Sequence, residues 1–125
     1  MNEDTLESIL RLVRRVYLPE PVANYIARLV DSTHPGKSQA AEDLKYGASP
    51  RAALSLASAA KAYALMQNRV HASFEDVKYL APAVLRHRLL LDYNAKVEGK
   101  TADSIIARIL DEVSFELKLA PQTLR

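Results

Sequence analysis

An arginine at the start of an alanine-rich segment is the residue with the clearest potential for chemistry. Residues 47–52 read Gly-Ala-Ser-Pro-Arg-Ala. Ser49 is a favoured helix N-cap and Pro50 suits the first helical position, so Arg51 is expected in the first turn of a helix. That turn carries unpaired amides and the positive end of the helix dipole, which attract anions, and a guanidinium can hold phosphate through two hydrogen bonds. Arginines also reach first turns by chance, so the pattern indicates an anion site without naming the ligand.

Other kinds of reactive site have no support in the sequence. The three histidines, His34, His71 and His87, share no metal-ligand spacing, and cysteine is absent. Only three glycines occur, so neither a P-loop nor a dinucleotide fingerprint can be built. No nucleophile elbow or paired carboxylates are evident. We therefore expect no metal site, and no catalysis by this chain in isolation.

A second basic feature is the run Arg86-His87-Arg88. It lies in a locally positive part of the chain, because residues 34–91 hold eight Lys/Arg and four Asp/Glu. This run is either a solvated helix face or part of an anion site for a nucleotide phosphate or a nucleic-acid backbone. The net charge of the whole chain is only +2, which argues against nucleic acid as a partner.

The elements that would position these residues read as helices. The 125 residues suit one domain, and apolar side chains recur at helical spacing in five segments. The segments carry the apolar stripes Leu6–Val13, Val22–Val30, Arg51–Gln67, Phe74–Leu85 and Ile105–Val113. The fold class is therefore all-α, a small bundle of about five helices over residues 1–113. The remaining residues, 114–125, form a tail in which Phe115, Leu117 and Leu119 alternate with charged residues, typical of a short strand or an extended arm.

Local signals set the expected boundaries of these helices. Asp4 is the expected cap of the first helix, Ser73 with Asp76 starts the fourth, and Thr101 or Asp103 caps the last. Pro82 is expected to kink or restart the fourth helix. Residues 31–46 are polar and predict a long loop, with at most a helical turn near residues 40–44. The alanine-rich helix is expected to be central, because alanine lets neighbouring helices approach closely.

Several segments resemble the C-terminal lid domain of the MoxR family of AAA+ ATPases. Residues 47–60 resemble the family's sensor-2 motif, Gly-Ala-Ser-Pro-Arg-Ala, and residues 81–89 match its Val-Leu-Arg-His-Arg stretch. Residues 22–30, 69–77 and 103–113 resemble other lid helices, in the same order. The chain departs from the family at His34, where an arginine usually follows the threonine, and at Asn68, where a glycine is usual.

The resemblance implies a function for the chain within a larger protein. The lid would close over ATP, with its Mg²⁺, held mainly by an N-terminal P-loop core that these residues do not contain. Arg51, as the sensor-2 arginine, would reach the γ-phosphate. The full-length protein would form a ring, usually a homo-hexamer. It would act as a chaperone-like ATPase maturing other protein complexes, and its partners would include proteins with von Willebrand factor A domains.

Two other functions remain open on the sequence alone. One is a stand-alone helical protein-interaction module, and the other is a helical nucleic-acid-binding domain. The alanine-rich helix offers mostly small apolar side chains, which favour packing over reading a DNA groove. No apolar run is long enough to span a membrane, and the acidic N-terminus is unlike a signal peptide, so the protein is expected in the cytoplasm without a membrane partner.

Overall fold

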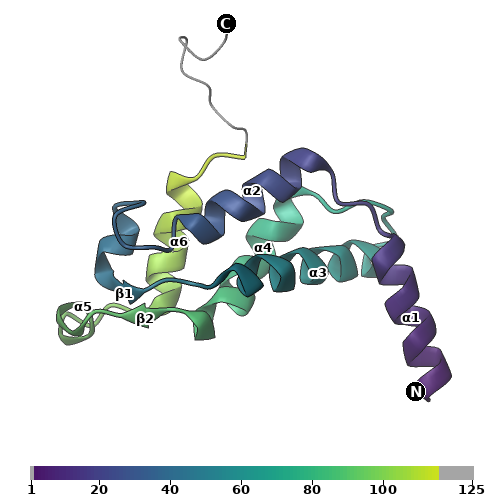
Figure 1. Cartoon of the computed structure of the whole chain (residues 1–125), viewed down its shortest axis with the longest axis horizontal. Coiled ribbons are helices and arrows are strands. Elements are labelled where there is room, and N and C mark those ends of the chain that lie inside the picture. The colour runs from purple at the N-terminus through teal and green to yellow at the C-terminus, as the bar shows by residue number, and fades with distance from the viewer. Residues whose placement is uncertain (1, 116–125) are drawn as a thin grey trace, which may run out of the picture.

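A computed structural model describes residues 2–115 of the chain. Six α-helices, two short 3₁₀ helices and two short strands follow one another (Figure 1). In chain order they are α1 (Glu3–Arg15), α2 (Glu20–Asp31), η1 (Ala40–Asp43), β1 (Leu44–Tyr46), α3 (Pro50–Met66), α4 (Phe74–Leu85), η2 (Arg86–Arg88), β2 (Leu90–Leu91), α5 (Tyr93–Val97) and α6 (Ala102–Glu112). The predicted helical bundle is confirmed, and its five expected segments correspond to α1, α2, α3, α4 and α6.

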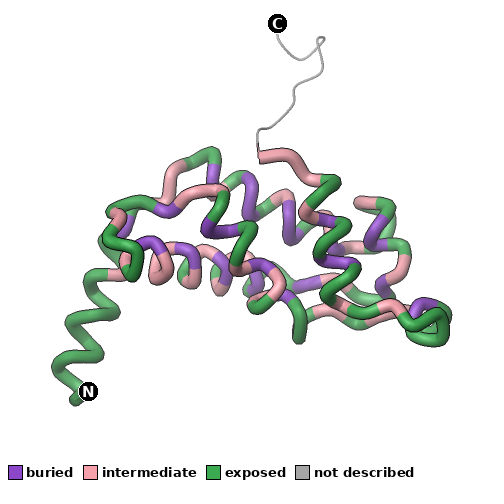
Figure 2. Tube along the Cα trace, turned by 180° about the vertical axis from the view of Figure 1, so that it is seen from behind, coloured by how far each residue is buried: buried purple, intermediate pink, exposed green. Residues whose placement is uncertain are grey.

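The alanine-rich helix α3 is central, as expected, because it packs against α1, α2 and α4. Its fully buried side chains recur every four residues along one stripe, at Ala52, Leu56, Ala60 and Ala64. Three of the four are alanines, so neighbouring backbones can approach closely along this stripe. Figure 2 shows the buried residues concentrated where the helices face one another. The core thus fixes the position of α3 along its whole length.

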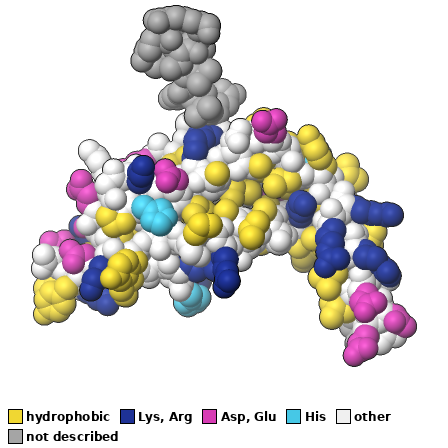
Figure 3. Space-filling model, viewed as in Figure 1, with side chains coloured by type: hydrophobic (Ala, Val, Ile, Leu, Met, Phe, Trp, Pro, Cys, Tyr) yellow, Lys and Arg dark blue, Asp and Glu magenta, His cyan; other side chains and the backbone are white. Residues whose placement is uncertain are grey.

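The first helix, α1, projects from one end of the bundle, and none of its residues is buried (Figure 2). Its cap is Asn2, whose side chain accepts a hydrogen bond from the amide of Thr5 at 2.8 Å, so the expected cap at Asp4 is wrong. Acidic residues lie in its first turn and arginines in its last, an order that complements the helix dipole. Figure 3 shows this separation of charge along the projecting helix.

The connection from α3 to α4 is held by a Schellman turn and an ion pair. Asn68 has a φ of 61°, and the amides of Asn68 and Arg69 donate to the carbonyls of Leu65 and Ala64. Arg69 then binds the buried carboxylate of Asp76 through both of its terminal nitrogens. Burial alone would raise the pKa of Asp76, but the hydrogen bonds from Arg69 and Ser73 outweigh it and hold that pKa below its usual value.

Helices α4 and α6 both begin with a capping box. In α4 it pairs Ser73 with Asp76, as predicted, and in α6 it pairs Thr101 with Ser104. Pro82 does not restart α4, which continues through it to Leu85 before tightening into η2.

Residues 31–46 are more ordered than the predicted long loop. The expected helical turn is present as η1, but it leads directly into β1, which pairs antiparallel with β2 through Leu44–Leu91 and Tyr46–Leu90. Asp43 fastens this region to α6, because its carboxylate accepts hydrogen bonds from Lys100 and Arg108 at 3.0–3.1 Å.

The last described residues fold back onto α2. Arg28 donates hydrogen bonds to the carbonyls of Ser114 and Phe115 at 2.7 and 2.9 Å. The ring of Phe115 packs edge-on to Tyr25 and stacks on Phe74, with centroids 5.2 and 5.1 Å apart. The alternating tail beyond Phe115, predicted as a strand or an arm, lies outside the described residues, and the boundary at residue 113 stays a prediction. No helix in residues 2–115 has the length and apolar character to cross a membrane.

Candidate functional site

The start of α3 is built as its residue types predict, with one exception. Ser49 occupies the N-cap position with an extended backbone, φ −76° and ψ 167°, and Pro50 is the first helical residue. The exception is the hydroxyl of Ser49, which makes no capping hydrogen bond to the helix. The start of α3 is therefore held by contacts outside the helix itself.

Those contacts come from Thr33, immediately after α2. Its hydroxyl is fully buried, donates to the carbonyl of Val30 at 2.6 Å and accepts from the amide of Ala48 at 2.9 Å. Gly47 lies directly against it. A Cβ atom at position 47 would lie 2.6 Å from the carbonyl carbon of Thr33 and would collide with its oxygen. The end of α2 and the start of α3 are thereby locked together, two residues before the helix begins.

Arg51 projects into solvent from this braced helix start. It is the second residue of α3 and is exposed, and within residues 2–115 its guanidinium has no hydrogen-bonding or ion-pairing partner. The first turn of α3 contains no acidic residue. A guanidinium that is exposed and not neutralised within the described residues is able to bind an anion, and the anion site itself stays a prediction.

A shallow hollow of about 240 Å³ lies between the end of α2 and the start of α3. Four of its lining residues are apolar, and Asp31 and His34 supply the polar groups; the apolar ones are Ala27, Val30, Pro50 and Ala53. Figure 3 shows apolar side chains gathered between these two helices. Apolar surface therefore lies beside the helix start that carries Arg51.

The basic run at residues 86–88 divides into two different environments. Arg86 pairs with Asp103 through two hydrogen bonds of 2.8 and 3.0 Å, which raise its pKa. Arg88 turns the other way and donates to the hydroxyl of Ser55 on α3 at 3.1 Å. His87 is exposed. The structure therefore brings Arg88 to Ser55 of α3, which is four residues after Arg51, and leaves Arg86 in a surface ion pair.

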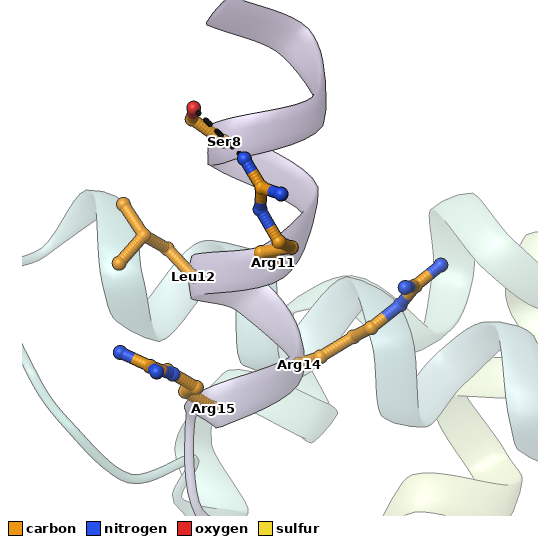
Figure 4. A pocket seen from close by; sticks show the side chains of 5 residues that line it. All are labelled: Ser8, Arg11, Leu12, Arg14 and Arg15. Atoms are coloured by element: carbon orange, nitrogen blue, oxygen red, sulfur yellow. Dashed lines mark hydrogen bonds between the residues drawn. The ribbon is translucent and has the colours of Figure 1, made fainter. Parts of the chain in front are cut away.

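The remaining candidate features do not form a site of their own. No group of three or more potential metal ligands occurs among the described residues, in which His34, His71 and His87 lie apart. A hollow of about 490 Å³ beside α1 is lined by residues of that helix alone, three of them arginines (Figure 4). Arg11 there donates a long hydrogen bond of 3.5 Å to the hydroxyl of Ser8 in the same helix. A surface made by one exposed helix lacks the walls that enclose a ligand.

The stretch of sequence that contains the start of α3 matches a known protein family. The family model for the AAA lid domain matches residues 36–109. The chain belongs to the AAA lid domain family. This match contains α3 with Arg51, η2 and α4, and it includes most of α6.

The relatives of this lid include proteins named for ATPase or chaperone activity. YeaC of Bacillus subtilis, itself uncharacterized, is 36% identical over 108 residues, which are 86% of this chain and 32% of YeaC. The chaperone MoxR1 of Mycobacterium tuberculosis is 32% identical over 111 residues, covering 85% of this chain and 29% of MoxR1. A crystal structure of a protein assigned as an ATPase, from Cytophaga hutchinsonii, superposes with a TM-score of 0.80 at 36% identity, covering 86% of this chain and 34% of that one.

These likenesses confirm the predicted resemblance to the lid of a MoxR-family AAA+ ATPase. The chain spans about a third of the length of the relatives that it matches. Sequence reasoning singled out Arg51, whose role stays a prediction, and missed the supporting role of Thr33 and the contact of Arg88 with Ser55. The sequence did offer a signal for Thr33, because the family it resembles usually has a threonine at this position. No sequence signal indicated the contact of Arg88 with Ser55, because these two residues are 33 positions apart in the chain.

Proposed function

We propose that this lid closes over ATP bound to a P-loop core in the same polypeptide, and that Arg51 is its sensor-2 arginine. The observation that carries this proposal is the state of Arg51, which is exposed, unpaired within the described residues and fixed at a helix start braced by Thr33 and Gly47. Because the guanidinium has no partner within residues 2–115, its charge would be available to the γ-phosphate. Mg²⁺ and most of the nucleotide would be bound by the core.

The activity proposed for the full-length protein is ATP hydrolysis coupled to the remodelling of other proteins. The name of the relative MoxR1 supports a chaperone. A homo-hexameric ring, partners with von Willebrand factor A domains and a cytoplasmic location belong to the same proposal. The present chain would be catalytically inactive by itself, since it contains no P-loop.

Substitution of Arg51 in the full-length ATPase tests this function. A guanidinium placed at the γ-phosphate would stabilise charge that develops during cleavage, and loss of such a group costs about 10²–10³ in rate. Arg51→Ala is therefore expected to lower kcat for ATP hydrolysis by about that factor. Arg51→Lys should restore it only in part, because an ammonium group cannot form the planar two-pronged contact.

Stability must be measured on the same variants. Arg51 opposes the helix dipole, so Arg51→Ala should leave the melting temperature unchanged or raise it slightly. Normal hydrolysis by Arg51→Ala would refute the proposal. A loss of activity that follows a large fall in melting temperature would also refute it, because Arg51 would then act on folding.

A further inference from the structure

Arg88 lies against the first turns of α3. Its Nη2 donates to the hydroxyl of Ser55 at 3.1 Å, and its Nε donates to the carbonyl of Val84 at 3.2 Å. Ser55 is four residues after Arg51 in the same helix. Residues with this spacing share a helix face, with Cβ atoms about 5–6 Å apart. The guanidinium of Arg88 is thus anchored one helical turn from the root of Arg51.

Both contacts of Arg88 are with neutral oxygen atoms, so its charge is not neutralised. Within residues 2–115, neither Arg51 nor Arg88 forms an ion pair with a carboxylate. Arg86, two residues away in the same run, is paired with Asp103. A guanidinium has five N–H donors, and the two anchoring bonds leave three of them available.

Two like charges that approach the same helix face repel each other, and an anion that contacts both of them removes this repulsion. The bonds to Ser55 and Val84 hold Arg88 in this position, so less of its conformational freedom is lost when a ligand binds. A multiply charged anion can contact both groups at once, whereas a single carboxylate is matched by one guanidinium. The arrangement therefore favours a polyphosphate.

We propose that Arg88 is a second phosphate-binding side chain, which acts with Arg51 on the same polyphosphate. The identification of this ligand as the nucleotide rests on the function proposed above. Arg51 extends from the start of α3 and Arg88 reaches it from the end of α4, through η2. A ligand that contacts both arginines would therefore bridge two helices that the core already packs together.

The test is a titration of this chain with inorganic tripolyphosphate at low ionic strength, followed through the Nε–H resonances of the arginines. The signals of Arg51 and Arg88 should shift along one saturation curve. Arg88→Ala should weaken binding about two- to fivefold, the effect of one solvent-exposed charged contact. Arg86→Ala is the matched control, because it removes the same charge from the same run, and it should weaken binding less than Arg88→Ala because it acts only through long-range attraction. Arg88→Gln provides a second variant, which keeps a polar side chain, and backbone amide spectra establish that each variant is folded.

Three outcomes would overturn the inference. The first is a response of Arg51 alone to the anion. The second is no response of either arginine at millimolar tripolyphosphate. The third is that Arg86→Ala weakens binding as much as Arg88→Ala does. The last result would show a general effect of positive charge. Failure of the sensor-2 function is detected separately, by normal hydrolysis in the Arg51→Ala ATPase, so the two ideas can fail independently.

Discussion

Substitution of Thr33 by valine tests whether Thr33, rather than the N-cap residue Ser49, holds the start of α3 in place. Valine has nearly the same shape as threonine but cannot accept the hydrogen bond from the amide of Ala48. Ala48 is fully buried, so water cannot replace the lost acceptor. An unsatisfied buried donor costs about 1–3 kcal/mol. The new methyl group would also occupy the place of a hydroxyl that lies 2.6 Å from the carbonyl of Val30, closer than carbon allows, and such overpacking costs about 1–3 kcal/mol.

Together these effects predict a loss of about 3 kcal/mol in the free energy of unfolding, measured by urea denaturation of the isolated lid. For a domain of this size that loss lowers the melting temperature by roughly 10–15 °C. Thr33→Ser keeps both hydrogen bonds and removes one methyl group, so it should cost about 1 kcal/mol.

Ser49→Ala is the second control. Removal of an N-cap hydroxyl usually costs about 1 kcal/mol, but the hydroxyl of Ser49 makes no capping bond and its loss should cost under about 0.5 kcal/mol. The reasoning would be refuted if Thr33→Val were as stable as the unmodified lid. It would also be refuted if Ser49→Ala were the more damaging change.

Three further outcomes are expected. In the same denaturation assay, Asn68→Gly should stabilise the lid by about 0.5–1 kcal/mol and Asn68→Ala should destabilise it, because the φ angle of residue 68 is 61°. The opposite order of stability would contradict a left-handed turn at this residue. Since the pKa of Asp76 is lower in the folded chain, its ion pair stabilises the fold above the unfolded value of about 4, and this stability is lost as pH falls through the folded pKa. Asp76→Asn should therefore be less stable at neutral pH and show a shallower loss on acidification, and an unchanged pH profile would exclude Asp76 as the source. The isolated chain should show no ATP hydrolysis above a buffer control and no salt-dependent shift of duplex DNA at physiological salt. ATP turnover would refute the proposal that the chain is inactive without a P-loop core, and a salt-dependent shift would favour the nucleic-acid-binding alternative.

The long helices could be predicted because each carries its own signal. Apolar spacing located α2, spacing together with cap residues located α3, α4 and α6, and the abundance of alanine in α3 indicated its central place. Segments of two to five residues, β1, β2 and α5, are too short to show a period. The strands also depend on pairing between residues far apart in the chain, which the sequence does not display.

Two single residues illustrate where local rules succeeded or misled. Asn68 follows a long helix, and asparagine is the usual alternative to glycine in a left-handed turn, so its conformation was open to prediction. Pro82 suggested an interruption, yet α4 continues through it. The carbonyl that loses its amide partner there belongs to Lys78, four residues earlier, and this residue is exposed. Water can satisfy that carbonyl, which reduces the cost of the proline.

The charge at the start of α3 differs from that of the other long helices in the described chain. Helices α1, α2, α4 and α6 each have an acidic residue in the first turn, whereas α3 has none and carries Arg51. A cation at this end lowers the stability of the helix by about 0.3–1 kcal/mol. The buried stripe of α3 and the bond from Ala48 to Thr33 can offset that loss. An external anion would offset that loss of stability, because the helix dipole and Arg51 would both attract the same negative charge. The charge at the start of α3 therefore does not add to the stability of the lid, and it fits the phosphate-binding role proposed for Arg51.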